Sequence, residues 1–290
     1  MKKRGMARVV AIAALCSSIS AHGEDFDAIR LAMPYSAAGA YLTINAFPPG
    51  GRWSNSGNPG VWIRSATTSR RRKFIAKIAP TVDGKRAEIL RLEDTTPGPL
   101  RIVTEAGAIE AAFAGPDVIL LRGTAPRIGL EMDFDGRGPD RVPCADATAF
   151  LRGDLMLNVA FDVRKGDIAG CEPGRKGGGW LSVAPQGGGL EVAVIDNVAE
   201  WDGRVPKVSF DDAVAANRLS FARFAELLPS VGTEFEETRL KAAKTMWMCQ
   251  VSPRGLVKRH AMFMSKNWMN KIWSWDHVFN AIAKIGRAHV

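Results

Sequence analysis

The sequence predicts an antiparallel β-sandwich followed by helices, and three observations support this fold class. Short apolar runs of roughly four to eight residues fill the chain from about residue 27 to residue 214. Gly, Pro, Asn or Asp interrupts these runs about every ten residues, as the turns of a sandwich require. After about residue 217 the apolar residues take the spacing of an amphipathic helix.

The predicted strands are apolar runs, several of which alternate apolar and polar side chains as half-buried strands do. The turn signals between them include DGK at 83–85, GRKGGG at 174–179 and QGGG at 186–189. Neither Gly-rich run is followed by GK[ST], so both are interpreted as hairpin turns and not as phosphate loops. The basic run at 64–73 is interpreted as a solvated hairpin or loop. The predicted strands cover 40–47, 60–67, 73–82, 100–106, 117–125, 127–134, 154–163, 179–186 and 190–198.

Two helices are expected directly after the strands, and a further helix is expected to begin around residues 267–271 and to continue to the end of the sequence. The first has helical periodicity in LSFARFAELLP and stops at Pro229. The second is expected to open with a capping box formed by Thr233 and Glu236 and to carry a Glu237–Lys241 pair at i,i+4. Its apolar stripe is expected to consist of Phe235, Ala242, Ala243, Met246 and Trp247.

The N-terminus has the pattern of an export signal. A basic segment, MKKRGMAR, precedes the apolar run VVAIAALCSSIS, and small residues near Ala21 suit a signal peptidase. The apolar run is too short to cross a bilayer. We therefore expect cleavage after residues 1–21, a periplasmic or secreted bacterial protein and no membrane span after cleavage. An uncleaved anchor or a misassigned start is the alternative.

The cysteines of an exported chain would be Cys144, Cys171 and Cys249, an odd number that cannot pair completely. Cys144 and Cys171 could form a disulfide in an oxidising compartment, and three free thiols are the alternative. No spacing resembles a metal site or a calcium loop, so neither a metal nor a cofactor is expected.

The charge of the chain argues against nucleic acid as a partner. The formal net charge is +9, but five of the cations lie in the first 21 or the last six residues. The remaining part has 34 bases against 30 acids, a balance too mild for a nucleic-acid or anionic membrane surface.

A stretch near the C-terminus, SKNWMNKIWSWDHVFNA at 265–281, holds residues suited to a sugar site. On a helix, Ile272, Trp275, Phe279 and Ile282 form one apolar stripe. An adjacent face carries Trp273, Asp276, His277 and Asn280. An indole can cover the C–H face of a pyranose while a carboxylate accepts hydrogen bonds from its hydroxyls. The alternative is structural: a half-buried Trp273, with Asp276 and His277 on a solvated face or in a satisfied pair.

Residues 262–281 resemble the start of the catalytic domain in bacterial glycosidases related to glycoside hydrolase family 63, which includes mannosylglycerate hydrolase and processing α-glucosidase. Val278 stands where the family pattern has Cys. MWMCQVSPRGLVKR at 246–259 resembles the lead-in to that domain. IRLAMPYSAAGAYLTI at 29–44 resembles the PFSRRGSY opening of its N-terminal sandwich, with Ala37 and Ala38 replacing a basic pair.

The resemblance implies that the sandwich precedes an (α/α)6 barrel and that Asp276 hydrogen-bonds a glycosyl unit in the −1 subsite. Trp273 or Trp275 would line the pocket, and Lys266, Asn267 and His277 are weaker candidates. The family inverts the anomeric centre with two carboxylates far enough apart to admit a water. Both are expected downstream of this chain, so the catalytic acid and base are not identified here.

The resulting organisation is a signal peptide at 1–21, a β-sandwich at 22–215, a helical linker at 216–248 and the truncated start of the barrel at 249–284. Twelve barrel helices need far more residues than the chain offers after residue 217. The last six residues, IGRAHV at 285–290, translate ATC GGA AGA GCA CAC GTC, the start of a common sequencing adapter. We expect 285–290 to be an artefact.

The function predicted from the sequence is the N-terminal portion of an inverting glycoside hydrolase that acts on α-glucosides or α-mannosides and is inactive as this fragment. Its partner would be an oligosaccharide or glycoside. The alternatives are a non-catalytic β-sandwich that binds a carbohydrate or a cell-envelope partner, and an unrelated helical interaction module.

Overall fold

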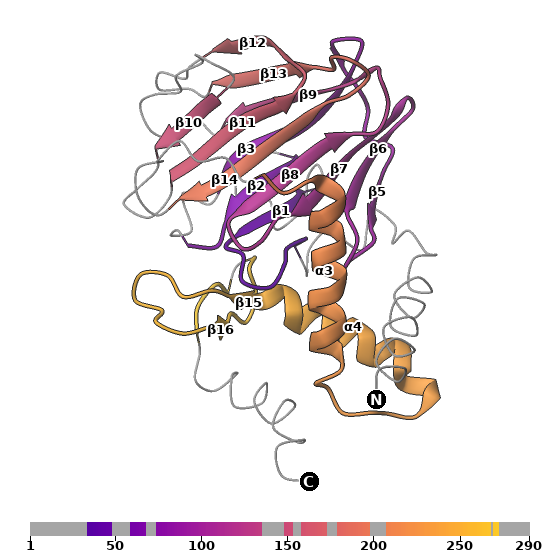
Figure 1. Ribbon diagram of the computed structural model, residues 1–290, viewed down its shortest axis with the longest axis vertical. Coiled ribbons are helices and arrows are strands. Elements are labelled where there is room, and N and C mark those ends of the chain that lie inside the picture. Colours follow the sequence, from indigo (N-terminus) through magenta and orange to yellow (C-terminus); the bar gives the residue numbers. More distant parts are fainter. Residues whose placement is uncertain are drawn as a thin grey trace.

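The computed structural model describes residues 34–47, 59–67, 74–134, 148–152, 158–172, 179–197, 207–267 and 269–272. These residues form two stacked antiparallel sheets with two helices at one end (Figure 1). No helix within these ranges is long and apolar enough to cross a membrane. The two stacked sheets confirm the predicted β-sandwich, and the barrel remains a prediction.

The first sheet has the strand order β1-β2-β3-β9-β13-β12, with β4 paired to β3. Neighbouring strands in it are antiparallel, although β9 neither follows β3 nor precedes β13 directly in the chain. Its strands are β1 (Leu42–Phe47), β2 (Gly60–Ser65), β3 (Phe74–Val82), β4 (Lys85–Arg86), β9 (Ile128–Phe134), β12 (Asp167–Glu172) and β13 (Trp180–Ala184).

The second sheet has the order β10-β11-β14-β8-β7-β6-β5 and is also antiparallel. Each of the nine predicted strand runs overlaps a strand of one of the two sheets. The strands of the second sheet are β5 (Arg91–Asp94), β6 (Leu100–Thr104), β7 (Gly107–Phe113), β8 (Val118–Gly123), β10 (Thr148–Arg152), β11 (Asn158–Lys165) and β14 (Glu191–Asn197).

The main core lies between the two sheets and is built by alternate residues of each strand. In β9, for example, Leu130 and Met132 are fully buried while Glu131 between them is half-buried. Phe113 and Phe161 are the largest of the fully buried side chains. Tyr35 joins this core, where its hydroxyl donates to the carbonyl of Ala111 over 2.9 Å. Burial raises the Tyr35 pKa, which keeps this phenol a donor.

Two predicted turns differ in outcome. Asp83 and Gly84 have φ values of 50° and 77° and link β3 to β4, as expected for a two-residue hairpin. The QGGG turn at 186–189 is tight, with Gln186 paired to Gly189, but it joins β13 to β14 in opposite sheets. The prediction of a hairpin was therefore wrong there, because local turn chemistry does not specify which sheet the next strand enters.

The basic run at 64–73 does connect the antiparallel strands β2 and β3, so the predicted hairpin is confirmed. Its first residue is not solvated, however. Arg64 lies in β2 with only 7% of its surface exposed, between the rings of Phe47 and Phe74. A charge run in the sequence thus conceals one buried guanidinium.

The helix α3 (Phe210–Ala225) begins earlier than the predicted helical segment, whose start was placed at residue 216. Its N-cap is Ser209, whose hydroxyl accepts a hydrogen bond from the Asp212 amide over 3.1 Å. Asp211 and Asp212 in the first turn favour the positive end of the helix dipole. The sequence contains a signal for this start, because Ser209 and Asp212 have the S-x-x-D spacing of a helix N-terminus, and the prediction missed it.

The first turns of α3 cover the outer face of the second sheet. Small side chains there, Ala112, Ala160 and Ala193, make room for Phe210 and Ala213 of the helix. Asn217 donates from Nδ2 to the Phe113 carbonyl over 2.9 Å. Further along, Phe221, Phe224, Ala225 and Leu228 belong to the main core between the sheets. The helix therefore runs from one face of the sandwich to its end, as Figure 1 shows.

The second predicted helix is α4 (Glu236–Cys249), preceded by the 3-10 turn η1 (Thr233–Phe235). The expected capping box is absent, because the N-cap of α4 is Phe235 and no side chain caps either element. The Glu237–Lys241 pair is confirmed at 2.9 Å. The predicted stripe is correct only in part: Ala243 and Trp247 are buried, Met246 is partly buried, and Phe235 and Ala242 are exposed.

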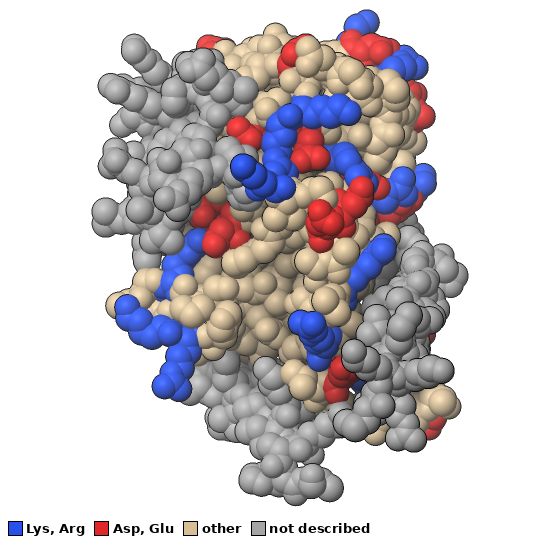
Figure 2. All heavy atoms as spheres, in the orientation of Figure 1, with Lys and Arg blue, Asp and Glu red and all other residues tan. Residues whose placement is uncertain are grey.

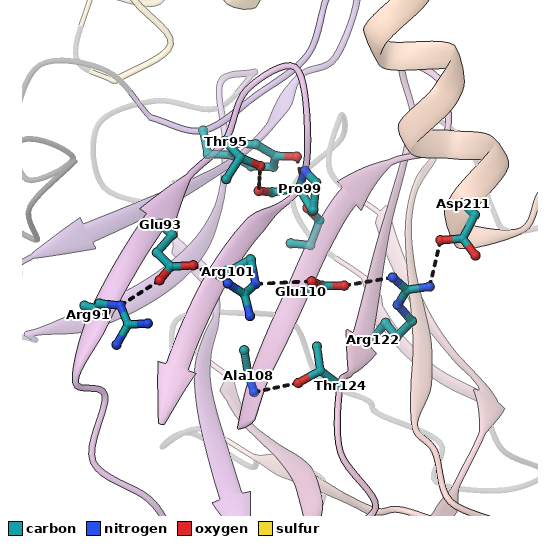
Figure 3. Close-up of polar contacts among 12 residues, drawn as sticks. Arg91, Glu93, Thr95, Pro99, Arg101, Ala108, Glu110, Arg122, Thr124 and Asp211 are labelled. Carbon is teal, nitrogen blue, oxygen red and sulfur yellow. Dashed lines mark hydrogen bonds and ion pairs between the residues drawn. The ribbon is translucent and has the colours of Figure 1, made fainter. Parts of the chain in front are cut away.

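Ion pairs of alternating sign cross the outer face of the second sheet from β5 to α3 (Figure 3). Glu110 of β7 lies at the centre, 3.3 Å from Arg101 and 2.8 Å from Arg122, which in turn pairs with Asp211. Bases and acids are interspersed on the molecular face drawn in Figure 2, as expected for a solvated surface.

Replacing Glu110 with Gln is expected to lower the free energy of unfolding by about 1 kcal/mol, because two partly exposed pairs are lost together. Urea denaturation at low salt measures this, and the effect should shrink at about 1 M salt through screening. A matched control is Glu237→Gln, which removes one exposed helix pair and should change stability by less than about 0.5 kcal/mol. Equal effects at both sites would contradict a cooperative network.

The structure gives the bonding state of two of the three cysteines that follow residue 21. Cys171 in β12 is disulfide-bonded, and Cys249 at the end of α4 is a free thiol. The alternative of three free thiols is therefore wrong. Cys144 lies outside the described residues.

Candidate functional site

The predicted sugar-binding residues fall in two groups. Trp273, Trp275, Asp276 and His277 lie outside the described residues, so their predicted contacts stay predictions. Lys266 and Asn267 are described, and both lie in the segment that follows α4 and leads toward Asp276. We call this segment, residues 250–267, the strap.

The strap is attached to the sandwich beside the first strand. It contains the hairpin of β15 (Gln250–Val251) and β16 (Ala261–Met262). Val251 forms a parallel bridge with Gly39. The Gly39 amide donates to the carbonyl of Gln250, and the Ser252 amide donates to the carbonyl of Gly39, each over 2.9 Å. Gly39 has a φ of 87°, and a Cβ there would lie 2.6 Å from the Ser252 hydroxyl, so glycine is required for this approach.

A small apolar cluster seals the strap against the sandwich. Val251 is fully buried, and Phe263 packs edge-on against Tyr41 with their ring centroids 5.9 Å apart. The Tyr41 hydroxyl donates to the carbonyl of Ser252 over 2.7 Å. The strap is therefore held both by apolar burial and by backbone pairing.

Lys266 enters the sandwich with its whole side chain and is 2% exposed. Its amine donates to the Ser36 hydroxyl over 3.0 Å and to the Ala37 carbonyl over 2.9 Å. Burial lowers its pKa from 10.5 to about 7, and the nearby Cys249 thiol opposes that shift. Its predicted sugar contact stays a prediction; in the structure its amine bonds to the loop before β1.

Asn267 accepts a hydrogen bond from Nη1 of Arg64 over 2.7 Å. Burial lowers the Arg64 pKa to about 10, and its Nε has no hydrogen-bond partner within the described ranges. The two aromatic rings that flank the guanidinium, at 4.8 and 5.3 Å, compensate in part for the lost hydration. Asn270 donates to the Ala66 carbonyl at the end of β2. The residues before Asp276 are thus fixed on β2.

A charged cluster that the sequence analysis missed holds the middle of the strap. Arg254 donates from Nη1 to Asp196 over 2.6 Å and from Nη2 to Asp117 over 3.0 Å. Its guanidinium carbon lies 4.6 Å from the Tyr41 ring centroid. Asp196 is fully buried, and burial raises its pKa to about 6 although Arg254 opposes the shift. No signal in the sequence joins these residues, because they lie on three separate elements.

The described part of this region holds cations, carboxylates and amides that already bond to one another. No group of three His, Cys, Asp or Glu side chains among the described residues could hold a metal ion. The arrangement attaches and orients a segment of the chain.

Comparisons with known proteins support the fold. No family model and no curated protein matches the chain. The structure is similar to that of the family GH92 α-mannosidase from Bacteroides thetaiotaomicron, with a TM-score of 0.53 and 10% sequence identity. The similarity covers 80% of this chain and 41% of that one, so the chain spans less than half of the α-mannosidase. At this identity the likeness shows a shared fold and no more.

Proposed function

We propose that the chain is the N-terminal part of a glycoside hydrolase in which the sandwich carries and orients the start of a catalytic domain. The observation that supports this most is the meeting of two distant motifs. The PYSAAG segment at 34–39 and the SKNW segment at 265–268 resemble separate parts of one glycosidase family, and Lys266 bonds to Ser36 and Ala37. Two chance resemblances would have no reason to contact each other.

The fold shared with an α-mannosidase favours the same class of function. The finer proposal is an inverting enzyme for α-mannosides or α-glucosides, related to glycoside hydrolase family 63, with an (α/α)6 barrel after the sandwich. Asp276 would accept hydrogen bonds from hydroxyls of the sugar while Trp273 or Trp275 covers its C–H face. The acid and base would come from elsewhere in the barrel, so this chain alone would hydrolyse no glycoside.

Asp276→Asn in the complete gene product tests this proposal. Losing a charged hydrogen-bond acceptor for sugar hydroxyls should lower kcat/KM for aryl α-mannosides or α-glucosides by about 10- to 100-fold. Asp211→Asn, at an exposed position on α3, is the control and should leave kcat/KM unchanged. Unchanged hydrolysis in Asp276→Asn would contradict the site. Sugar binding without any hydrolysis by the complete protein would favour the non-catalytic sandwich.

We also propose that the protein is exported to the periplasm or beyond. The disulfide at Cys171 supports this, because such bonds persist in oxidising compartments and are rare in the bacterial cytosol. Detection of the protein in a periplasmic extract, without residues 1–21 by mass spectrometry, is the expected result. A reduced, full-length protein in the cytosol would contradict export.

A further inference from the structure

We infer that the strap is a pH-dependent attachment that is weakest near neutral pH and tightens in both acid and alkali. The inference does not depend on the proposed function. It rests on two buried groups of opposite charge. One is a carboxylate of the sandwich that faces the middle of the strap, and the other is an amine at the end of the strap. In each case the charged form of the group has too few hydrogen-bond partners or opposite charges around it, for a different reason.

The first group is the carboxylate of Asp196, at the end of β14. Its Oδ2 accepts from Arg254, but its buried Oδ1 has no hydrogen-bond partner in the part of the chain that the structure describes. One guanidinium serves two carboxylates here, because Arg254 also binds Asp117. The charged or titratable groups that face Asp196 are Arg254 from the strap, Asp117 from the loop before β8, and Tyr41. Burial also raises the Asp117 pKa. Protonation of either carboxyl therefore favours the closed strap, which is the attached state that the structure shows.

The second group is the amine of Lys266. An ammonium has three protons to donate, whereas the buried amine has two acceptors within hydrogen-bond distance among the described residues, Ser36 and Ala37. The Ser36 hydroxyl donates its own proton to the Leu42 carbonyl, so it can only accept from the lysine. The titratable group that faces the amine among the described residues is the Cys249 thiol, at the end of α4. An uncharged amine has two protons and matches the two acceptors.

The directions of the two effects follow from where each proton binds more tightly. The closed strap holds a proton on Asp196 up to about pH 6, whereas a solvated Asp loses it near 3.8. Closing is therefore favoured as the pH falls from about 6 to 4. The closed strap releases the Lys266 proton near pH 7, whereas a solvated Lys keeps it to 10.5. Closing is therefore favoured as the pH rises above 7.

Hydrogen exchange of the 290-residue chain tests the inference. The reporters are the amides of Gly39 and Ser252, which form the backbone hydrogen bonds between the strap and the loop before β1, and the amide of Phe263, which donates to the carbonyl of Cys249 at the end of α4. Protection factors, corrected for intrinsic exchange, are compared at about pH 4.5, 6.5 and 9, with β3 and β9 amides as the internal reference. Protection of the reporters should be lowest at about pH 6.5 and at least about tenfold higher on each side. A reporter profile that is flat, or that changes in one direction only, overturns the inference.

Two variants assign the two arms of the profile. Asp196→Asn should remove the rise in acid and keep the rise in alkali, and Lys266→Met should do the reverse. Matched controls are Asp211→Asn and Lys241→Met, which replace exposed residues outside the strap and should keep both arms. If a variant does not fold, the profile of the unmodified chain still decides. Loss of both arms in either single variant would mean that the pH dependence arises elsewhere, and the inference fails.

Discussion

A chain that ends at residue 215 is expected to be unfolded or insoluble, although residue 215 is the sandwich boundary that the sequence predicts. The helices after that residue do not merely follow the sandwich. Phe221 and Phe224 of α3, and Trp247 of α4, are at most 6% exposed and belong to the same core cluster as the sheets. Their removal would open the end of the sandwich to water.

The expected loss exceeds the stability of an ordinary domain. Burying a large apolar side chain contributes about 1.5–3 kcal/mol, and the truncation removes several of them from the main core and from the cluster of Val251 and Phe263. Polar anchors are lost as well, such as Lys244 to Asp94 at 2.9 Å. A typical domain has only about 5–15 kcal/mol to lose.

Far-ultraviolet circular dichroism and size-exclusion chromatography of the truncated chain measure this result. A chain that ends at residue 272 keeps every contact described above and is the control, which should remain folded and cooperative in thermal unfolding. A soluble, cooperatively unfolding chain of residues 22–215 would show that the sandwich is an independent domain and would contradict the expectation.

The strands were predictable because their signals are local. In β3 and β9 the alternation of apolar and polar residues records which face is buried, and Asp83-Gly84 records the hairpin that follows. The strand β7 was missed because GAIEAAF is rich in alanine, which is depleted in strands on average. Its Ala112 is needed where α3 lies close to the sheet, beside Phe210 and Ala213. Tertiary packing, which no local pattern contains, decided that strand.

The candidate site was predictable only as far as its residue types. Lys266 and Asn267 stood out because they lie beside tryptophans and an aspartate, and that pattern carries no information on their partners. Ser36 and Arg64 lie about 200 or more positions earlier in the chain. Arg254 drew no attention at all, because in a sequence it is one arginine in a polar loop. Only the fold shows that it meets two carboxylates.

Arg254→Ala is expected to lower the free energy of unfolding by about 3–5 kcal/mol near neutral pH, because it leaves the carboxylate of Asp196 buried without a cation. The effect should depend on pH. Arg254 is the group that lowers the Asp196 pKa, so its removal raises that pKa further above 6. A carboxyl whose pKa is higher in the folded chain than its ordinary 3.8 contributes stability at low pH and loses it as the pH rises. The variant should therefore recover part of its loss at about pH 5.

Urea denaturation at about pH 5 and about pH 8 measures the two values, and the double variant Arg254→Ala with Asp196→Asn separates charge from packing. If the uncompensated carboxylate causes the loss, the double variant should be more stable than Arg254→Ala alone at about pH 8 and about equal to it at pH 5. Arg254→Lys keeps a cation but cannot bind two carboxylates with the geometry of a guanidinium. Its free energy of unfolding should therefore lie between that of the unmodified chain and that of Arg254→Ala. An equal loss at both pH values, without rescue by Asp196→Asn, would mean that Arg254 stabilises the strap through its contact with Tyr41 and not through its charge.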